Sequence, residues 1–403
     1  MKAGVFKMAK KYGLIGAKLS YTYSPLIHKE FGDYQYDICE TKADELAGLL
    51  ASPEYDGFNV TIPYKKTVLK LCDIVSDEAM KIGAVNAVVR TEDGRLAGYN
   101  TDYFGFKYQL EHNDIDVEDK KCVVLGDGGA SVTIQAVLSD LHAREIVVVS
   151  RKGENNYDNI SKHYDAEILV NATPVGMYPD NGGCLVNVAD FKALEGVIDV
   201  IYNPYRTKLI LDAMAQGIPC AGGLEMLVAQ AKQTSEIFTG NQIDDDEIET
   251  VVDEVQRRVL NNVLIGMPGA GKTFLGKKMA EKQGKRFIDI DDMVEQHEGT
   301  SIEDIFKTKG EAYFRKVETE MLKLACKENG CVIATGGGII KTKANYNIVK
   351  QNGVVIWIKR DLDKLETEGR PLSTSTGVEQ LYKERKDEYK RWSDYYIDNN
   401  QEL

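Results

Sequence analysis

The sequence lacks the marks of a secreted, membrane-spanning or zinc-binding protein. Among its 403 residues are seven cysteines, an odd number without a CxxC pair, and five histidines that stand apart from them. This pattern argues against a disulfide framework and against a zinc site. No run of about 18 apolar residues occurs, and no apolar stretch of signal-peptide length follows the opening MKAGVFKMAKKYGLIGA. We therefore expect a cytoplasmic protein without a membrane partner.

The sequence also has no excess of positive charge. It contains 50 Lys and Arg residues against 63 Asp and Glu residues, a net charge of -13, and no dense basic run. A nucleic acid is therefore not expected as a partner, and neither is an anionic membrane. The length corresponds to two or three domains of about 150 residues each. The sequence predicts no oligomeric state.

Short β-rich runs alternate with helical patterns along the chain, which is typical of α/β folds with mainly parallel sheets. In the first block we expect strands at YGLIGA, YQYDIC and DGFNVTI, and a hairpin in AVNAVVRTEDGRLAGYN that turns at Asp93-Gly94. The second block begins near Val117. There KCVVLGDGGAS passes from a β-branched run through a glycine turn into a helix, and EIVVVS, AEILVNA and GVIDVIY follow as strands. This order is typical of a dinucleotide-binding domain.

The segment DDDEIETVVDEVQRRVL is acidic at its start and basic at its end, and its apolar residues are Ile248, Val251, Val255 and Val259. These spacings predict one amphipathic helix whose charges match its dipole. A third block then begins at NNVLIGMPGAGKT, which leaves Asn261-Asn262 as the linker, and RFIDID, CVIATGGG and VVIWIK are its further strands. The predicted domains are a substrate domain (1–104), a Rossmann-type domain (105–240), a helix with linker (241–260) and a P-loop domain (261–403).

The stretch GMPGAGKT fits the pattern GxxxxGK[ST] between a strand and a helix. In this pattern glycine backbone N–H groups surround phosphates, the lysine reaches the outer phosphates and the hydroxyl binds Mg²⁺. We therefore predict ATP and Mg²⁺ as ligands here. The nucleotide-binding residues are predicted to be Gly266, Gly269, Ala270, Gly271, Lys272 and Thr273.

Two aspartates in RFIDIDDM follow the next strand. Asp289 and Asp291 are expected on the same side of that strand, because strand side chains repeat every two residues. One could hold Mg²⁺ while the other accepts a hydroxyl proton; alternatively, the two are a helix N-cap and a first-turn charge. Together with GEAYFRKVE, TGGG, EGRPLS and RKDEY, this order resembles shikimate kinase from about Asn262 to Asp398.

The resemblance implies specific roles. Asp291 would help to deprotonate the acceptor hydroxyl, Asp289 would support Mg²⁺, and Arg315 and Arg385 would grip the substrate carboxylate. The remaining implied residues are Gly336, Gly337 and Gly338 beside the substrate ring and Arg370 on a lid over the phosphate. The family usually continues past its last strand with an adenine-contacting loop and a closing helix, whereas this sequence ends at IDNNQEL. A nucleotide-binding domain without turnover therefore remains an alternative.

The turn LGDGGAS lacks the full GxGxxG spacing, so the next strand matters more for the cofactor. An NAD enzyme typically has an acidic residue about 20 residues on. Here VVVSRKG places Ser150, Arg151 and Lys152 at that strand end, and two cations suit the 2′-phosphate of NADP(H). The alternative is that both cations decorate a surface loop. Asp127 is unfavourable beside a pyrophosphate unless its side chain points outward.

The motifs YTYSPLIH, FNVTIPYKK, GAVNAV, YNTDYFG, NATPVGM, DVIYNP and GGLEMLVAQA together resemble shikimate dehydrogenase from about Tyr12 to Gly240. The resemblance implies that Lys65 and Asp102 form the acid–base pair; a plain salt bridge is the alternative. The implied substrate-binding residues are Thr22, Ser24, Thr61, Asn86, Tyr202 and Gln230. The implied cofactor-binding residues are Gly126, Gly128, Gly129, Ala130, Ser150, Arg151, Lys152, Gly223 and Met226. The family usually has Ser where this sequence has Thr22, which leaves the choice between shikimate and quinate open.

Both resemblances involve one small molecule. Reduction of 3-dehydroshikimate by NADPH yields shikimate, and ATP-dependent phosphorylation of shikimate yields shikimate 3-phosphate. The sequence thus predicts a bifunctional enzyme with an α/β substrate domain, a Rossmann-type NADP domain and a P-loop kinase domain with a parallel sheet. The alternative is a shikimate or quinate dehydrogenase fused to an inactive or regulatory nucleotide-binding domain.

Overall fold

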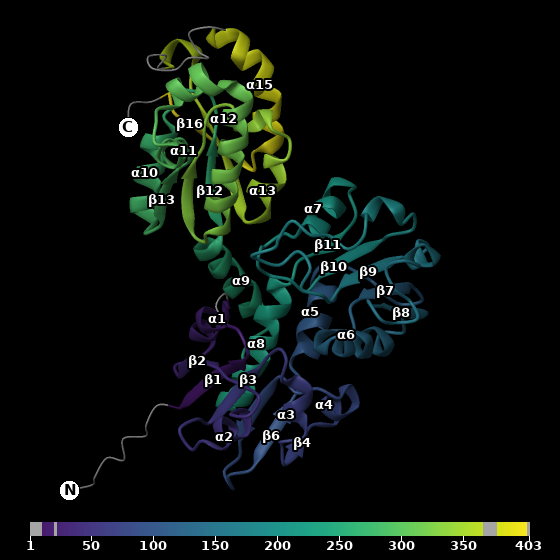
Figure 1. Cartoon of the computed structure of the whole chain (residues 1–403). Coiled ribbons are helices and arrows are strands. Elements are labelled where there is room, and N and C mark those ends of the chain that lie inside the picture. Colours follow the sequence, from purple (N-terminus) through teal and green to yellow (C-terminus); the bar gives the residue numbers. More distant parts are fainter. Residues whose placement is uncertain (1–9, 20–21, 366–376, 401–403) are drawn as a thin grey trace, which may run out of the picture. The chain divides into compact units, whose positions relative to one another are not determined.

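The computed structural model describes residues 10–19, 22–365 and 377–400. The chain divides into two compact units (Figure 1). Unit 1 comprises Met1–Asn203 and Asp212–Val255, and unit 2 comprises Pro204–Leu211 and Gln256–Leu403. Within the described ranges, every helix is too short or too polar to cross a membrane.

The first sheet of unit 1 is mixed and has the strand order β2-β1-β3-β5-β6-β4. Its strands are β1 (Lys11–Gly16), β2 (Gln35–Glu40), β3 (Gly57–Val60), β4 (Ile74–Val75), β5 (Ala87–Arg90) and β6 (Leu96–Tyr99). The helices are α1 (Ser24–Phe31), α2 (Leu46–Ala51), α3 (Lys65–Leu69) and α4 (Asp77–Ile82). β5 pairs with β6 in antiparallel register, with Gly94 at a φ of 84° between them, so the predicted hairpin is confirmed.

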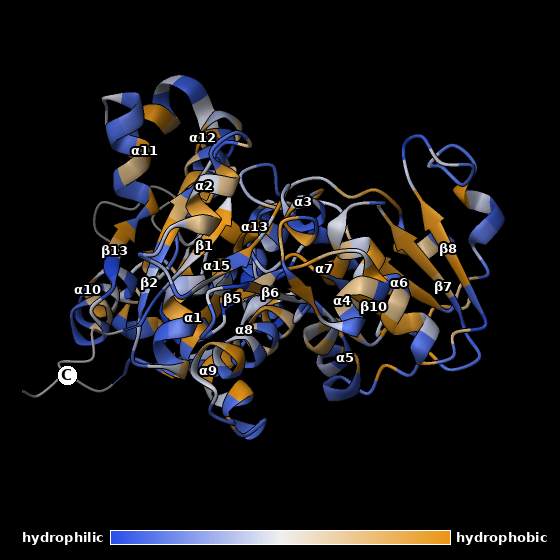
Figure 2. Cartoon of the chain, turned by 90° about the horizontal axis from the view of Figure 1, so that it is seen from below, coloured by the Kyte–Doolittle hydropathy of each residue, from blue (hydrophilic) through white to orange (hydrophobic). Residues whose placement is uncertain are grey.

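The second sheet of unit 1 is wholly parallel, with the order β11-β10-β9-β7-β8. Its strands are β7 (Lys121–Leu125), β8 (Glu145–Val149), β9 (Ile168–Asn171), β10 (Gly196–Asp199) and β11 (Cys220–Ala221). The helices that follow in this part of the chain are α5 (Asp102–His112), α6 (Gly129–Asp140), α7 (Lys208–Ala215) and α8 (Leu224–Thr239), with 3-10 turns η1 (Ile160–His163) and η2 (Val188–Asp190). β7 and β8 are strongly apolar (Figure 2), as expected for parallel strands covered on both faces.

Unit 2 contains a third, parallel sheet with the order β13-β14-β12-β15-β16. Its strands are β12 (Asn261–Ile265), β13 (Arg286–Asp289), β14 (Cys331–Ala334), β15 (Gly353–Lys359) and β16 (Tyr395–Asp398). The helices are α9 (Asp246–Val259), which spans the boundary between the units, α10 (Lys272–Gln283), α11 (Ile290–Glu298), α12 (Ile302–Lys327), α13 (Asn345–Gln351) and α15 (Val378–Trp392), with 3-10 turns η3 (Ile339–Lys341) and η4 (Leu362–Lys364). The predicted α/β class with parallel sheets is confirmed.

The predicted linker is wrong, because Asn261 and Asn262 are the first residues of β12 and pair with β15. Asn261 is fully buried. Its Nδ2 donates to the carbonyl oxygen of Glu328 at 2.7 Å, and its Oδ1 accepts from the backbone N–H of Cys331 at 2.8 Å. A buried polar side chain is tolerated when its hydrogen bonds are made. Only Leu260 lies between α9 and β12.

Replacement of Asn261 with Ala should lower the free energy of unfolding of unit 2 by about 2–3 kcal/mol, because a buried carbonyl and a buried N–H would lose their partner. Asn262 is the matched control, since its side chain bonds Gln283 at an exposed position. Urea unfolding can be followed by tryptophan fluorescence, because Trp357 and Trp392 both belong to unit 2. Equal losses in N261A and N262A would contradict the buried role of Asn261.

Candidate active sites

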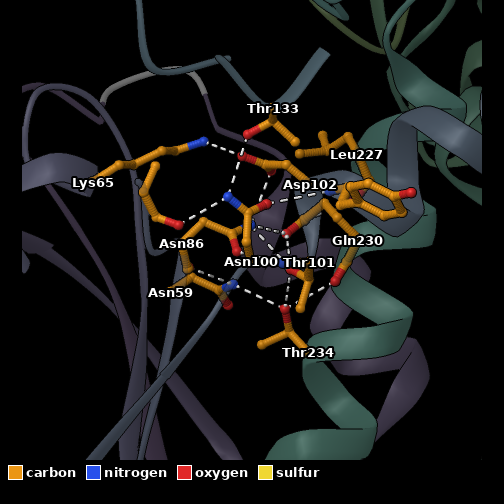
Figure 3. A network of polar contacts seen from close by, with 12 residues as sticks. Asn59, Lys65, Asn86, Asn100, Thr101, Asp102, Thr133, Leu227, Gln230 and Thr234 are labelled. Carbon is orange, nitrogen blue, oxygen red and sulfur yellow. Dashed lines mark hydrogen bonds and ion pairs between the residues drawn. The ribbon is translucent and has the colours of Figure 1, made fainter. Parts of the chain in front are cut away.

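The first site is built around an ion pair between two helix starts. Lys65 is the first residue of α3 and Asp102 is the first residue of α5. The Nζ of Lys65 donates to Oδ2 of Asp102 at 2.5 Å, and both side chains are largely buried (Figure 3). The other oxygen of Asp102, Oδ1, accepts from Nδ2 of Asn86 at 2.9 Å. Both carboxylate oxygens are therefore held, one by a cation and one by an amide.

A buried polar network fixes Asn86 in turn (Figure 3). Its Oδ1 accepts from the backbone N–H of Thr101 at 2.7 Å, and its Nδ2 lies 3.4 Å from Oε1 of Gln230 on α8. Thr101 Oγ1 is 2.9 Å from Oγ1 of Thr234, which accepts from Nδ2 of Asn59 at 3.2 Å. The network joins β3, the β5–β6 hairpin, α5 and α8, so it fixes the position of Asp102 relative to Gln230.

Hydroxyl groups gather at the start of α1. Thr22 Oγ1 donates to Ser24 Oγ at 3.0 Å and accepts from the backbone N–H of Ser24 at 3.2 Å. Tyr202 lies close to Tyr23 and Thr22. The centroid of its ring is 5.3 Å from that of Tyr23. Burial raises the pKa of Tyr202, and a hydrogen bond with Thr22 partly opposes that rise. Thr61 lies in the turn that leads from β3 to Lys65, where its carbonyl accepts from the N–H of Tyr64 at 3.0 Å. The structure thus brings Thr22, Ser24 and Tyr202 together.

The glycine turn after β7 lies next to the ion pair. A Cβ at Gly129, the first residue of α6, would be 3.7 Å from Cδ of Lys65. Gly126 has a φ of 107°, and a Cβ there would be 2.8 Å from Cγ2 of Thr173, so this position requires glycine. Gly128 is the N-cap of α6, makes no side-chain cap bond, and faces open space. The free N–H groups at this helix start suit the pyrophosphate of a dinucleotide, with Ala130 in the first turn.

The other predicted cofactor residues are distributed over two elements. Ser150 is buried at the end of β8, and Arg151 and Lys152 follow it with exposed side chains. Gly223 is the N-cap of α8 and donates its N–H to the carbonyl of Ile201 at 3.0 Å, while Met226 is buried in the first turn of α8.

The second site contains the phosphate loop between β12 and α10. Gly266, Gly269 and Gly271 all have positive φ, and Ala270 is buried between the last two. Lys272 is buried, and its Nζ donates to the carbonyls of Gly266 and Met267 at 3.0 Å each. Thr273 Oγ1 donates to Oδ2 of Asp289 at 2.8 Å. A hydroxyl and a carboxylate oxygen at this spacing are the oxygen ligands that Mg²⁺ prefers.

The structure corrects the strand argument for the two aspartates. β13 ends at Asp289, which is the N-cap of α11, and its Oδ1 accepts from the backbone N–H of Asp291 at 3.0 Å. Asp291 lies in the first turn of α11. The backbone therefore follows the alternative prediction, in which Asp289 is a helix N-cap and Asp291 is a first-turn charge. The carboxylate of Asp289 satisfies a helix N–H, which favours a helix start over a longer strand.

Two carboxylates face the TGGG loop. Oδ1 of Asp291 and Oε1 of Glu318 lie 2.9 and 2.6 Å from the position that a Cβ at Gly336 would take. Both atoms are shielded from solvent and accept no hydrogen bond from the residues that the structure describes, and Glu318 is 0% exposed. Burial, followed by the charges of Glu318 and Asp289, raises the pKa of Asp291 to about 7. Burial also raises the pKa of Glu318.

Two arginines complete this cluster. Arg315 Nη1 donates to Oε2 of Glu318 at 2.6 Å, and a Cβ at Gly338 would overlap the Arg315 guanidinium. Arg385 is 3% exposed, and its Nη1 donates to the carbonyl of Gly337 at 3.0 Å. Its Nη2 is buried and has no hydrogen-bond partner within the described ranges. Gly337 itself packs on Pro268 of the phosphate loop. Arg370 lies outside the described residues.

Glu318 and Tyr389 were not predicted as parts of this site. Tyr389 is fully buried and its hydroxyl donates to the carbonyl of Gly337 at 2.5 Å, beside Arg385. Glu318 ends the motif GEAYFRKVE and follows Arg315 by three residues on α12. Residues three apart on a helix are neighbours, so this spacing could have identified Glu318 as the partner of Arg315.

The comparisons with known proteins support both resemblances. A family model for the shikimate dehydrogenase substrate binding domain matches residues 14–88, and one for shikimate kinase matches residues 268–403. A shikimate dehydrogenase (NADP(+)) of Clostridium beijerinckii is 40% identical over 253 residues, which cover 58% of this chain and 93% of that protein.

Solved structures agree with this result. The chain is similar to a chorismate mutase/shikimate 5-dehydrogenase fusion protein from Clostridium acetobutylicum (33% identity, TM-score 0.59, 62% of this chain and 97% of that one). It is also similar to the shikimate 5-dehydrogenase of Thermus thermophilus in complex with NADP(H) and shikimate (28% identity, TM-score 0.56, 61% and 99%).

The raised pKa of Asp291 predicts that the stability of unit 2 depends on pH. The folded pKa of about 7 exceeds the unfolded value of about 3.9, so ionisation of Asp291 disfavours the folded state once the pH rises above the unfolded value. The Asp291→Asn variant should therefore be more stable than the parent chain at pH 8, on the order of 3 kcal/mol, since each pKa unit corresponds to about 1.4 kcal/mol. This gain should shrink as the pH falls through 7 toward 4.

Thermal unfolding of unit 2, followed by tryptophan fluorescence at pH 8 and pH 5.5, measures this difference. Glu320→Gln is the matched control, because Glu320 is an exposed carboxylate on α12. A gain in D291N that is the same at both pH values would show that the carboxylate is not destabilised by burial.

Proposed function

Because the chain belongs to the shikimate dehydrogenase family and carries a shikimate kinase domain, we propose that it catalyses two successive reactions. The first is NADPH-dependent reduction of 3-dehydroshikimate to shikimate, and the second is ATP-dependent phosphorylation of shikimate to shikimate 3-phosphate. One observation carries the proposal: each unit has a polar cluster next to its own phosphate-binding turn. Lys65 lies against Gly129 in unit 1, and the loop that faces Asp291 packs on Pro268 in unit 2.

In the reductase, Lys65 donates a proton to the substrate oxygen as that oxygen becomes an alkoxide. NADPH supplies the hydride when it is bound. Asp102 holds the lysine ammonium by its hydrogen bond, and Asn86 holds Asp102, so the proton donor is positioned before the substrate arrives. In the reverse reaction the same pair takes up the proton.

The substrate contacts follow from the polar groups nearby. Thr22 and Ser24 bind the substrate carboxylate through their hydroxyls, and Tyr202 closes the pocket over it. The ring hydroxyls are read by Thr61, Asn86 and Gln230. Gly126, Gly128, Gly129 and Ala130 bring the backbone to the pyrophosphate, and Ser150, Arg151 and Lys152 hold the 2′-phosphate. Gly223 and Met226 also bind the cofactor.

In the kinase, Asp291 accepts the proton of the 3-hydroxyl as the phosphate is transferred. A base with a pKa of about 7 suits this task at neutral pH. Arg315 and Arg385 bind the substrate carboxylate; the unpartnered Nη2 of Arg385 supports this role, because a buried guanidinium N–H needs an acceptor. Gly336, Gly337 and Gly338 line the ring. The phosphate loop with Lys272 holds ATP, and Thr273 and Asp289 hold Mg²⁺, which neutralises phosphate charge when bound. The role of Arg370 at the phosphate stays a prediction from the sequence, because this residue lies outside the described residues.

The deciding experiment assays the purified chain for both reactions. Turnover of shikimate with Mg-ATP, together with NADPH-dependent reduction of 3-dehydroshikimate, establishes the bifunctional enzyme. Reduction without phosphorylation would instead leave a dehydrogenase fused to a nucleotide-binding domain. Comparing shikimate with quinate as the dehydrogenase substrate decides between those two compounds.

Because the two proposed active sites are separate, a variant of one site should lose one activity and keep the other. Lys65→Ala should lower kcat/KM for reduction by about 10²–10⁴-fold, because the proton donor is removed, and should change phosphorylation by less than about twofold. Lys272→Ala should do the reverse. Each variant serves as the control for the other, and parallel loss of both activities in a folded variant would contradict the two-site proposal.

The unpartnered Nη2 of Arg385 predicts that a variant of this residue binds shikimate more weakly but binds ATP normally. Arg385→Ala should raise KM for shikimate by about 10–100-fold, the value of one or two charge-assisted hydrogen bonds, with little change in KM for ATP. Arg391→Ala is the matched control on the same helix, since Arg391 is exposed and pairs with Glu388; its KM values should change by less than about twofold. A rise in KM for ATP alone would place Arg385 at the nucleotide.

A further inference from the structure

An aspartate stands inside the dinucleotide turn of unit 1. Asp127 lies between Gly126 and Gly128, immediately before the start of α6, and its side chain is exposed. It does not cap the helix, because Gly128 is the N-cap and makes no side-chain cap bond. No described residue forms a hydrogen bond or ion pair with this carboxylate that would give it a structural role.

The sheet places the turn that carries Asp127 next to the turn that carries Arg151. β7 and β8 are neighbouring parallel strands in which Leu125 pairs with Val149. The ladder continues one step further, because the N–H of Gly126 donates to the carbonyl of Val149 at 2.8 Å. Asp127 and Arg151 each follow these paired residues by two positions, so the turns that carry them leave neighbouring strands at the carboxyl edge of the sheet.

The hydroxyl of Tyr157 experiences both charges. Burial raises the pKa of Tyr157, while the charge of Arg151 lowers it and the charge of Asp127 raises it. Both side chains thus lie near the same half-buried phenol, which agrees with the register argument. A carboxylate therefore lies in the turn next to the segment in which Arg151 and Lys152 would receive the 2′-phosphate.

We propose that Asp127 is a specificity residue that weakens binding of NADPH relative to NADH. The proposal rests on the proposed function, in which Arg151 and Lys152 bind the 2′-phosphate. That phosphate carries close to two negative charges and is absent from NADH, whereas the pyrophosphate is common to both cofactors. Repulsion between Asp127 and the pyrophosphate therefore affects NADPH and NADH equally. Repulsion between Asp127 and the 2′-phosphate weakens the binding of NADPH alone. The site accepts NADH more readily than its two cations alone would allow.

The experiment measures the affinity for NADPH and for NADH by fluorescence titration, and kcat/KM for each cofactor with 3-dehydroshikimate as substrate. Asp127→Asn should raise the NADPH/NADH ratio about three- to ten-fold, the size expected for one nearby charge in partly screened surroundings. Asp127→Glu keeps the negative charge, so this variant should have the same NADPH/NADH ratio as the parent chain. Glu118→Gln removes an exposed charge before β7, at the opposite edge of the sheet, and should leave the ratio unchanged. Added KCl should reduce the difference between D127N and the parent chain.

A D127N variant with an unchanged ratio would overturn the proposal, as would equal gains with both cofactors, which would assign Asp127 to the shared pyrophosphate. Arg151→Ala tests the proposed function separately. It should lower kcat/KM for NADPH far more than for NADH. If it affects both cofactors equally, the 2′-phosphate site is not at Arg151, and the ratio measured with D127N still decides the role of Asp127.

Discussion

One geometric constraint underlies the nucleotide-binding features of both units: all strands of a parallel sheet end at the same edge. In unit 1 this edge carries the glycine turn after β7 and the cationic segment after β8. In unit 2 it carries the phosphate loop after β12, Asp289 at the end of β13 and the TGGG loop after β14. The helices that follow begin at this edge, so their N-termini add positive charge there. The sheets therefore create anion-binding edges to which individual side chains add chemistry.

The substrate side of unit 1 follows a different rule, because its sheet is mixed. Asn86 precedes β5 and Asp102 follows β6, so the antiparallel hairpin returns the two residues to one end. Thr234 on α8 then closes the network from outside the sheet. Here an ion pair is buried only because every oxygen of Asp102 has a partner, and burial of an unpaired charge would be costly. The hairpin thus supplies the positioning that the parallel edge supplies elsewhere.

Much of this arrangement could be predicted from the sequence, because strands, glycine turns and the Asp93-Gly94 hairpin leave local patterns. The errors arose where local rules compete. A two-residue period predicted a strand through Asp291, but a side chain that caps a helix ended that strand at Asp289. Asn261 has the composition of a linker, and only its burial against Glu328 and Cys331 makes it part of a strand. The surroundings of Glu318 depend on tertiary burial, and the two-residue strands β4 and β11 leave no periodicity to detect.

The two clusters differ in how far their polar groups are satisfied, and under the proposed function this difference bears on how each would bind its substrate. In unit 1, both oxygens of Asp102 already accept hydrogen bonds. In unit 2, Asp291 Oδ1, Glu318 Oε1 and Arg385 Nη2 are shielded from water and have no hydrogen-bond partner in the described part of the chain. Such groups destabilise the fold until a ligand satisfies them. Under the proposed function, shikimate would offer hydroxyls to the two carboxylates and its own carboxylate to Arg385, whereas an analogue without one of these groups would leave a buried atom unpaired. The unsatisfied cluster therefore favours selectivity for its substrate at a cost in stability.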